Sequence, residues 1–167
     1  SELEAVDMFA TDTLAGGMGL APSSGRVVWH SEVDPRLALV ARGDGVWRSD
    51  DGGYTWAPSD RTEPVHAFID GPNGLLLAGT TSGVRYSRDR GRTWRSFEDP
   101  MAKIETFCFA RDGDIIYAGT SEGLFRGESG YQWAKVLSRY DSDVPVWDIA
   151  IDRFWENGMW LVGPVGV

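Results

Sequence analysis

The sequence is poor in the residue types that most catalytic and metal sites use. It contains one cysteine, Cys108, and two histidines, His30 and His66. A single cysteine excludes a disulfide within the chain, and its place in the apolar run TFCFA is typical of a small buried side chain. P-loop and H-E-x-x-H motifs are missing as well. The sequence therefore predicts no cofactor and no metal site.

Basic residues and long apolar runs are also scarce. Lys and Arg number 16 against 25 Asp and Glu, for a formal net charge of −9. Such a balance disfavours binding to nucleic acid or to an anionic membrane surface. No apolar run approaches the roughly 20 residues that a membrane-spanning helix needs. The sequence predicts partners other than nucleic acid and no membrane-spanning segment.

Glycine and tryptophan, by contrast, are abundant, at 21 and 8 residues in a chain of 167. No segment shows the 3.6-residue apolar period of an amphipathic helix, and none combines a helix start signal with an apolar stripe. Many turn residues together with many aromatic residues are typical of β proteins built from short strands. The composition predicts an all-β fold.

One octet occurs twice, as SDDGGYTW at 49–56 and SRDRGRTW at 87–94. The copies share Ser, Asp, Gly, Thr and Trp at the same offsets, and a worn third copy, RGESGYQW, follows at 126–133. The shared residues are Ser49, Asp51, Gly53, Thr55 and Trp56 in the first copy, Ser87, Asp89, Gly91, Thr93 and Trp94 in the second, and Gly130 and Trp133 in the third. The tryptophans are 38 and 39 residues apart.

Apolar strands repeat in step with the octets. One set reads LALVARGDGV, LLLAGTTSGV, IIYAGTSEGL and MWLVGPVGV, and each of the last three copies follows a second apolar run: VHAFID, ETFCFA or VWDIAI. A period of about 40 residues with four short strands predicts propeller blades. We expect a single domain over 1–167, a β-propeller-like array of about four antiparallel blades. The blade-like units are 1–25, 26–64, 65–103, 104–145 and a partial unit at 146–167.

The array is predicted to be an incomplete or open ring. An open arc exposes unpaired strand edges, so we expect a fragment, self-association that completes a ring, or docking on another protein chain. The first unit is compressed and leaves two interpretations open. Trp29 is either a worn octet tryptophan or part of an inner strand, VVWHSEV, that leads into the turn at Asp34-Pro35.

The octet has a conformational interpretation. Glycine suits backbone angles closed to other residues, the Asp carboxylate and the hydroxyls can accept turn amides, and the Trp ring can pack between blades. A calcium loop at Asp50, Asp51, Gly52 and Gly53 is the alternative, although the EF-hand spacing and its terminal Glu are missing.

The pattern S-x-D-x-G-x-T-W resembles the Asp-box, or BNR repeat, over roughly residues 26–167. Asp-boxes occur in sialidases, sortilin-type receptors, xyloglucan-degrading glycosidases and photosystem II assembly factors of the Ycf48 type. The resemblance implies that the box is structural and lies on the face opposite the ligand-binding side. It also favours an extracytoplasmic location, which is periplasmic, lumenal or secreted.

The leading functional hypothesis is a non-catalytic protein-interaction or assembly module. The alternatives are a piece of a glycoside hydrolase and a carbohydrate-binding module that uses exposed tryptophans such as Trp155 and Trp160. A glycoside hydrolase would need two facing carboxylates, for which the sequence offers Asp70, Asp114, Asp148 and Asp152 near inner-strand ends. A sialidase would need an arginine cluster, and the candidates are Arg61, Arg85, Arg95, Arg126 and Arg139.

Geometry narrows the search for a contact surface. In a propeller, the loops that enter inner strands lie on the face away from the boxes, and the longest is AKVLSRYDSDVP at 134–145. Its mixture of Arg139, Tyr140 and Asp143 is typical of protein recognition. His66 opens an inner strand, where it could line a central channel. These four residues are the candidate contact surface.

Overall fold

The computed structural model describes residues 25–43, 45–60, 63–98, 100–128, 132–136, 143–152 and 158–164. These residues form fourteen β-strands and two short 3-10 turns. The first sheet contains β1 (Gly25–His30), β2 (Ala38–Arg42), β3 (Gly45–Ser49) and β4 (Ala57–Pro58). The second contains β5 (Val65–Asp70), β6 (Leu76–Thr80), β7 (Gly83–Ser87) and β8 (Arg95–Ser96). The third contains β9 (Thr106–Asp112), β10 (Ile115–Thr120), β11 (Gly123–Glu128) and β12 (Gln132–Lys135), and β13 (Asp148–Asp152) pairs with β14 (Gly158–Val162).

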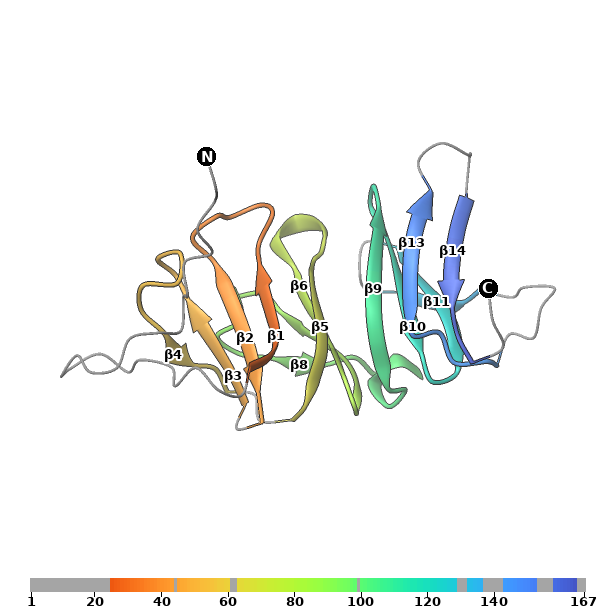
Figure 1. Ribbon diagram of the computed structural model, residues 1–167, viewed down its shortest axis with the longest axis horizontal. Coiled ribbons are helices and arrows are strands. Elements are labelled where there is room, and N and C mark those ends of the chain that lie inside the picture. The colour runs from red at the N-terminus through yellow and green to blue at the C-terminus, as the bar shows by residue number, and fades with distance from the viewer. Residues whose placement is uncertain are drawn as a thin grey trace, which may run out of the picture.

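Each sheet is an antiparallel meander in which strands pair in the order of the sequence. The first three sheets follow one another along the longest axis, and β13 and β14 overlap the third sheet in this view, so that the sheets form an open arc (Figure 1). The first strands of successive sheets, β1, β5, β9 and β13, contact one another along the inside of the arc. The described residues are thus propeller-like blades without ring closure, which confirms the predicted fold class.

The meander sorts the loops to two faces. The turns after inner strands, at 31–37 and 71–75, lie at the same end of the sheets as the octets at 50–56 and 88–94. We call this end the box face. The connections that lead into inner strands, at 59–64 and 97–105, lie at the other end, which we call the opposite face.

Alternation along the second strand of each sheet builds the core, because both faces of a middle blade are covered. In β6, Leu76 and Ala78 pack toward the first sheet, in a cluster with Leu39, Phe68 and Trp94. Leu75 before β6 and Leu77 within it pack toward the third sheet instead, in a cluster that contains Met101, Ile116 and Ala118. Period-two alternation therefore sends neighbouring residues into two different interfaces.

In the compressed first unit, Trp29 belongs to an inner strand. Trp29 lies within β1, opposite Leu39 of β2, and its ring centroid is 6.1 Å from that of Phe68. The interpretation of Trp29 as an octet tryptophan is therefore wrong, because the ring packs between the first and second inner strands. Residues 1–24 of the first predicted unit lie outside the described residues.

The last sheet is covered on one side only within the described part of the chain. Ile149, Ile151, Met159 and Leu161 pack in the cluster with the third sheet. Trp160 points the other way and is 58% exposed, and Val162 beside it is 45% exposed. A second chain or a second copy that completes the ring remains a prediction. Among the described residues, no helix is long and apolar enough to cross a membrane.

The turn between β6 and β7 offers a test of the blade packing. Gly83 has φ +107°, and a Cβ there would lie 2.2 Å from the Met101 carbonyl oxygen. We expect Gly83→Ala to lower the free energy of unfolding by roughly 2–4 kcal/mol through backbone strain and overpacking. Urea denaturation followed by tryptophan fluorescence measures it. Gly43→Ala is the matched control, since nothing lies within 4 Å of its Cβ position. Equal stability of the two variants would contradict the packing described here.

Candidate functional site

Each matching octet closes a turn between the third and fourth strands of its sheet. In the first, Ser49 Oγ donates to Asp51 Oδ1 at 2.7 Å and accepts the Gly53 amide at 2.8 Å. Asp51 accepts the Thr55 amide at 2.9 Å and the Thr55 hydroxyl at 2.6 Å. The serine and the aspartate therefore take up backbone amides that have no strand partner in the turn.

The second octet repeats these bonds atom for atom. Ser87 Oγ donates to Asp89 Oδ1 at 2.7 Å and accepts the Gly91 amide at 2.8 Å. Asp89 accepts the Thr93 amide at 2.9 Å and the Thr93 hydroxyl at 2.6 Å. The same five residue types thus build the same turn at both places.

The hydrogen bonds shift the titration of both aspartates. The Thr55 hydroxyl, the Thr55 amide and Ser49 together lower the pKa of Asp51 from 3.8 to about 2. For Asp89, burial acts to raise the pKa, but the bonds from Thr93, Ser87 and the Arg92 amide outweigh it and lower the pKa to about 2. Both carboxylates are therefore ionised, which is the form that accepts hydrogen bonds from the amides and hydroxyls of the turn.

The octet tryptophans act differently in the two sheets. Trp56 Nε1 donates to Gly53 O of its own turn at 2.9 Å. Trp94 Nε1 donates at 2.9 Å to Ser59 Oγ, which follows the outer strand of the preceding sheet, and Ser59 Oγ donates back to Gly91 O at 2.8 Å. The second octet therefore fastens its sheet to the first.

At the third copy an aromatic contact takes the place of this hydrogen bond. Phe97 follows Trp94 at the same distance at which Ser59 follows Trp56. Its ring meets the Trp133 ring edge to face, with centroids 6.4 Å apart. Trp133 Nε1 is buried and has no hydrogen-bond partner among the described residues. Gly130 lies outside the described residues.

Charges also link the first two octets. Asp50 pairs with Arg48 of its own sheet, and Arg92 and Arg90 of the second octet approach its carboxylate at 3.2 and 3.6 Å. Asp50 and Asp51 therefore have different partners, and the carboxylates proposed as a calcium loop are engaged by arginines in one case and by Thr55 in the other. Among the described residues, no group of three or more His, Cys, Asp or Glu could hold a metal ion.

A second arrangement lies on the opposite face, at the start of the inner strands. The pairing of β1, β5 and β9 with their neighbours shifts by a β-bulge at one equivalent place, which leaves Arg26, His66 and Phe107 as the bulge residues. Trp147 holds the corresponding place before β13, where its amide donates to Val162 O at 2.7 Å. A bulge re-aims one side chain out of the sheet alternation. Successive inner strands therefore present a row of rings, His66, Phe107 and Trp147, which we call the rim.

The rim is partly open to solvent and carries acidic groups. The rings of His66 and Phe107 have centroids 5.8 Å apart, and His66 Nε2 lies 3.0 Å from Glu105 Oε1. Trp147 is 50% exposed, and the exposed Asp148 follows it directly. Flat apolar faces beside carboxylates can hold an apolar or basic group of a ligand.

The other residues predicted from the sequence lie apart from the rim or outside the described chain. Arg139 and Tyr140 are outside it, as are Arg61 and Trp155, and the exposed Asp143 pairs with Lys135. Arg85 and Arg126 form separate ion pairs with Glu63 and Glu128, each at 2.9 Å. Arg85 and Arg126 thus face different partners, and Arg95 is exposed on β8.

The candidate catalytic carboxylates are also divided. Asp70 ends β5 on the box face, where it accepts Ser31 Oγ and the Glu32 amide, both at 2.9 Å. Asp152 ends β13 on that same face, whereas Asp148 begins β13 on the opposite one. Asp114 is exposed in the turn after β9. Asp70 and Asp148 therefore cannot face each other across one cleft, and Asp70 joins the first two sheets.

Sequence reasoning reached His66 but missed Phe107, Trp147 and Glu105. The signal was present, because the runs VHAFID, TFCFA and VWDIAI each carry a ring side chain at the second position. Aligning the three runs on the Val or Thr before that ring would have revealed the row. The bulges themselves have no sequence mark, so the exposure of these rings could not be read from the pattern.

Comparisons with known proteins agree on the fold. No protein-family profile matches the chain, and no curated protein matches its sequence. Among solved structures, an ancestral GH74 enzyme is similar over 84% of this chain and 23% of its own, with 16% identity and a TM-score of 0.64. YCF48 bound to D1 peptide is similar over 86% and 48%, with 17% identity and a TM-score of 0.57. The computationally designed Ika4 protein is similar over 93% and 92%, with 15% identity and a TM-score of 0.60.

These likenesses show a propeller-type fold similar to that of the GH74 enzyme, YCF48 and Ika4. The chain spans less than half the length of the GH74 enzyme and of YCF48. Identities of 15–17% show the fold and leave activity and partners open.

The lowered pKa values predict acid sensitivity. The ionised form of Asp89 is favoured by folding, so its stabilising effect is complete above its ordinary pKa of 3.8 and is lost as the pH falls toward about 2. We expect Asp89→Asn to be less stable at neutral pH and to lose less stability than the parent over that acid range. Urea denaturation at a series of pH values measures it. Asp114→Asn, in an exposed turn, is the control. An equal dependence of the unfolding free energy on pH in all three proteins would contradict the stabilising role of the ionised Asp89.

The buried Trp94 and the half-buried Trp133 are predicted to contribute differently to the free energy of unfolding. Trp94→Phe and Trp133→Phe remove similar ring area, but only the first removes a hydrogen bond to a described residue, that to Ser59. We expect Trp94→Phe to cost about 1 kcal/mol more than Trp133→Phe in unfolding free energy. A double-mutant cycle with Ser59→Ala should show coupling with Trp94 and none with Trp133. Coupling of Ser59→Ala with Trp133→Phe, and none with Trp94→Phe, would refute this assignment.

Proposed function

We propose that the chain is a non-catalytic propeller module that binds another protein through the rim on its opposite face. The observation that carries the proposal is the row formed by His66 and Phe107 at equivalent bulges of β5 and β9 and by Trp147 at the corresponding place before β13. Exposed aromatic side chains held on rigid strands are the usual anchors of protein interfaces. The row lies away from the octets, whose polar groups are used within the frame.

The chemistry of the rim favours an extended peptide segment with apolar and basic side chains. Apolar groups can pack on the rings of Phe107 and Trp147, while Glu105 and Asp148 supply carboxylates for a Lys or Arg. His66 is already oriented by Glu105 at 3.0 Å. The net charge of −9 adds a general attraction for a basic segment.

The comparisons support this proposal at the level of precedent. YCF48, which shares the fold, has been solved bound to D1 peptide. A propeller of this kind can therefore take a peptide ligand. The sequence identity to that protein is 17% over the matched region, so this precedent does not identify the partner of the present chain.

A second candidate function is carbohydrate binding or glycoside hydrolysis. The similarity to a GH74 enzyme favours it, as do the exposed rings of Trp147 and Trp160, 50% and 58% exposed. Flat exposed rings stack on sugars as well as on peptides. The two candidates separate by experiment, because one needs peptide binding and the other binding or cleavage of a glucan.

The test is selection of peptides from a displayed random library on the immobilised chain, followed by titration of the selected peptides. We expect Trp147→Ala to weaken peptide binding by roughly tenfold or more, because it removes an anchor ring. Tyr54→Ala is the matched control, since Tyr54 is 90% exposed on the box face, away from the rim.

Xyloglucan oligosaccharides are titrated in parallel, with release of reducing ends as the readout for cleavage. Binding or cleavage of these sugars that depends on Trp147, without selected peptides, would replace the proposal by its alternative. Peptides that bind Trp147→Ala and the parent equally would exclude the rim as the binding site.

A further inference from the structure

The last sheet contains two strands within the described part of the chain. β14 pairs with β13 along one edge, and no described residue pairs with its other edge. In the other three sheets the second strand, which is β2, β6 or β10, also pairs with a third strand. An unpaired edge leaves backbone N–H and C=O groups able to pair with a further strand. The edge of β14 is therefore open where the other sheets continue.

The interface between the third and fourth sheets is less buried than the two interfaces before it. Leu39 and Leu77 face the next sheet from the middle of β2 and β6, and both are 0% exposed. Tyr117 holds the equivalent place in β10 and is half-buried. From the other side of this interface, Leu161 of β14 is also half-buried, whereas Ala118 at the equivalent place in β10 is 0% exposed. Apolar surface thus stays open on both sides of this interface.

In a complete sheet the third strand covers this part of the interface. Phe125 of β11 lies directly opposite Ala118 of β10 and packs in the cluster with the second sheet, where it is 5% exposed. Cross-strand neighbours share one face of a sheet. A residue opposite Leu161, on a strand added to the free edge of β14, would therefore point toward the third sheet, where Tyr117 lies. An aromatic residue at that place would cover the apolar surface that is half-buried now.

The third sheet offers a second contact point, at Val136. Val136, Phe97 and Ser59 each stand three residues after the tryptophan of their own octet. Ser59 accepts the Nε1 hydrogen of Trp94 from the next sheet at 2.9 Å, and Phe97 packs on the ring of Trp133 from the next sheet. Val136 is half-buried, and the described strands of the fourth sheet, β13 and β14, contain no octet. The series therefore predicts a tryptophan that packs on Val136.

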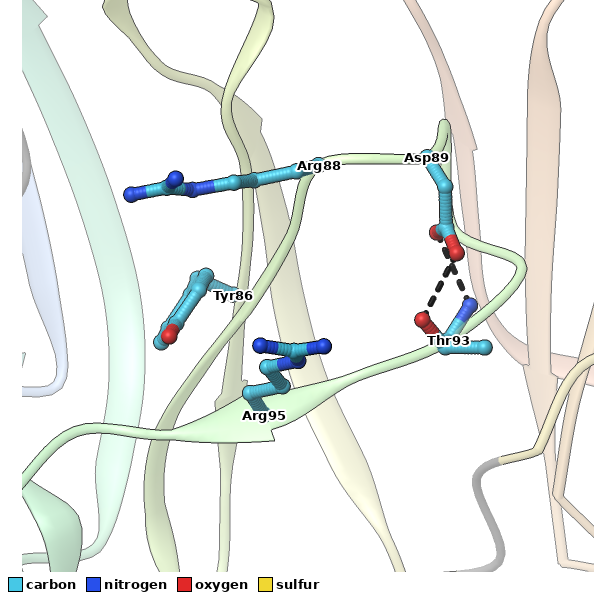
Figure 2. A pocket seen from close by; sticks show the side chains of 5 residues that line it. All are labelled: Tyr86, Arg88, Asp89, Thr93 and Arg95. Carbon is cyan, nitrogen blue, oxygen red and sulfur yellow. Dashed lines mark hydrogen bonds between the residues drawn. The ribbon is translucent and has the colours of Figure 1, made fainter.

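The segment that fills both places in a complete sheet is a hairpin of third strand, octet and fourth strand. Figure 2 shows this hairpin in the second sheet, around a pocket lined by Tyr86, Arg88, Asp89, Thr93 and Arg95. Tyr86 of β7 lies opposite Arg95 of β8, and between them Thr93 donates its amide and its hydroxyl to Asp89. These turn bonds lie within the hairpin, so the octet does not depend on the rest of the sheet for them.

We infer that the free edge of β14 binds a hairpin of this octet type that another protein chain supplies. Its first strand pairs with β14, an aromatic residue of that strand packs on Leu161 and Tyr117, and its octet tryptophan packs on Val136. A second copy is a poorer donor, because the hairpins that begin at β3, β7 and β11 are each paired with the second strand of their own sheet. The rim shares no residue with this site, so the contact is independent of the proposed function.

The experiment is an NMR titration of the ¹⁵N-labelled chain with an unlabelled synthetic peptide of residues 45–58, GVWRSDDGGYTWAP. The peptide carries Trp47 at the aromatic place of its first strand and Trp56 as its octet tryptophan. Its side chains include one Arg and two Asp, so general charge attraction to a chain of net charge −9 does not favour binding. We expect amide shifts in β14 and at Val136, together with slower hydrogen exchange in β14.

Peptide variants test the two aromatic contacts without changing the protein. Peptides with Trp47→Ala or Trp56→Ala should each bind roughly tenfold more weakly, because each loses an anchor ring. The peptide with Tyr54→Ala is the matched control and should bind like the parent peptide, since Tyr54 is 90% exposed within its octet. The inference is overturned by no shifts at millimolar peptide, by shifts at β2 in place of β14, or by equal binding of the Trp56→Ala and parent peptides.

A protein variant tests the contact at Val136. Val136→Asp should weaken peptide binding roughly tenfold or more, because a carboxylate replaces the apolar contact of the tryptophan. Val33→Asp adds the same charge at a 72% exposed place on the box face and should leave binding unchanged. An equal loss of affinity in both variants would overturn the inference. So would a dimer of the chain alone, seen by sedimentation equilibrium, in which the β14 amides are already protected, because the occupant would then be a second copy.

Discussion

The second and third sheets of this chain each have two apolar faces, and a neighbouring sheet has to cover each of these faces to remove it from water. In β6, Leu76 and Ala78 face one neighbour while Leu77 faces the other. Burial of a leucine is worth about 2 kcal/mol, so a blade with one bare face loses much of its stabilisation. The octets follow from this constraint, because stacked sheets must be held at a fixed spacing, and Trp94 and Ser59 do so at the first interface.

The rigid frame determines where binding groups can be placed. Hydrogen-bonding capacity on the box face is largely used within the turns, as the bonds to Asp51 and Asp89 show. At the bulges of β5 and β9, the rings of His66 and Phe107 are half-buried and contact each other, and Trp147 before β13 is 50% exposed.

The strands and octets could be predicted from the repeat in the sequence, because both depend on local residue types at fixed spacing. The all-β class, the four-stranded blades and the open arc follow from that pattern, and the fold similarity agrees. Of the rim residues, only His66 was predicted from the sequence. A bulge is a property of the pairing between strands and leaves no residue signature. The place of Trp29 was undecided for a related reason, since one ring can pack equally well in an octet or in an inner strand. The links from Asp50 to Arg90 and Arg92 depend on which residues of two sheets face each other, which spacing alone does not reveal.

The meander order has a consequence for how such a chain folds and changes over time. Within a sheet each strand pairs with its predecessor, and each sheet contacts the sheets that come directly before and after it in the chain. Assembly can then start at any blade and spread outward, as in other one-dimensional arrays. Duplication or deletion of a whole blade adds or removes one interface without rewiring the rest. Lineages of such proteins can thereby change in length by whole repeats while their remaining surfaces keep their roles.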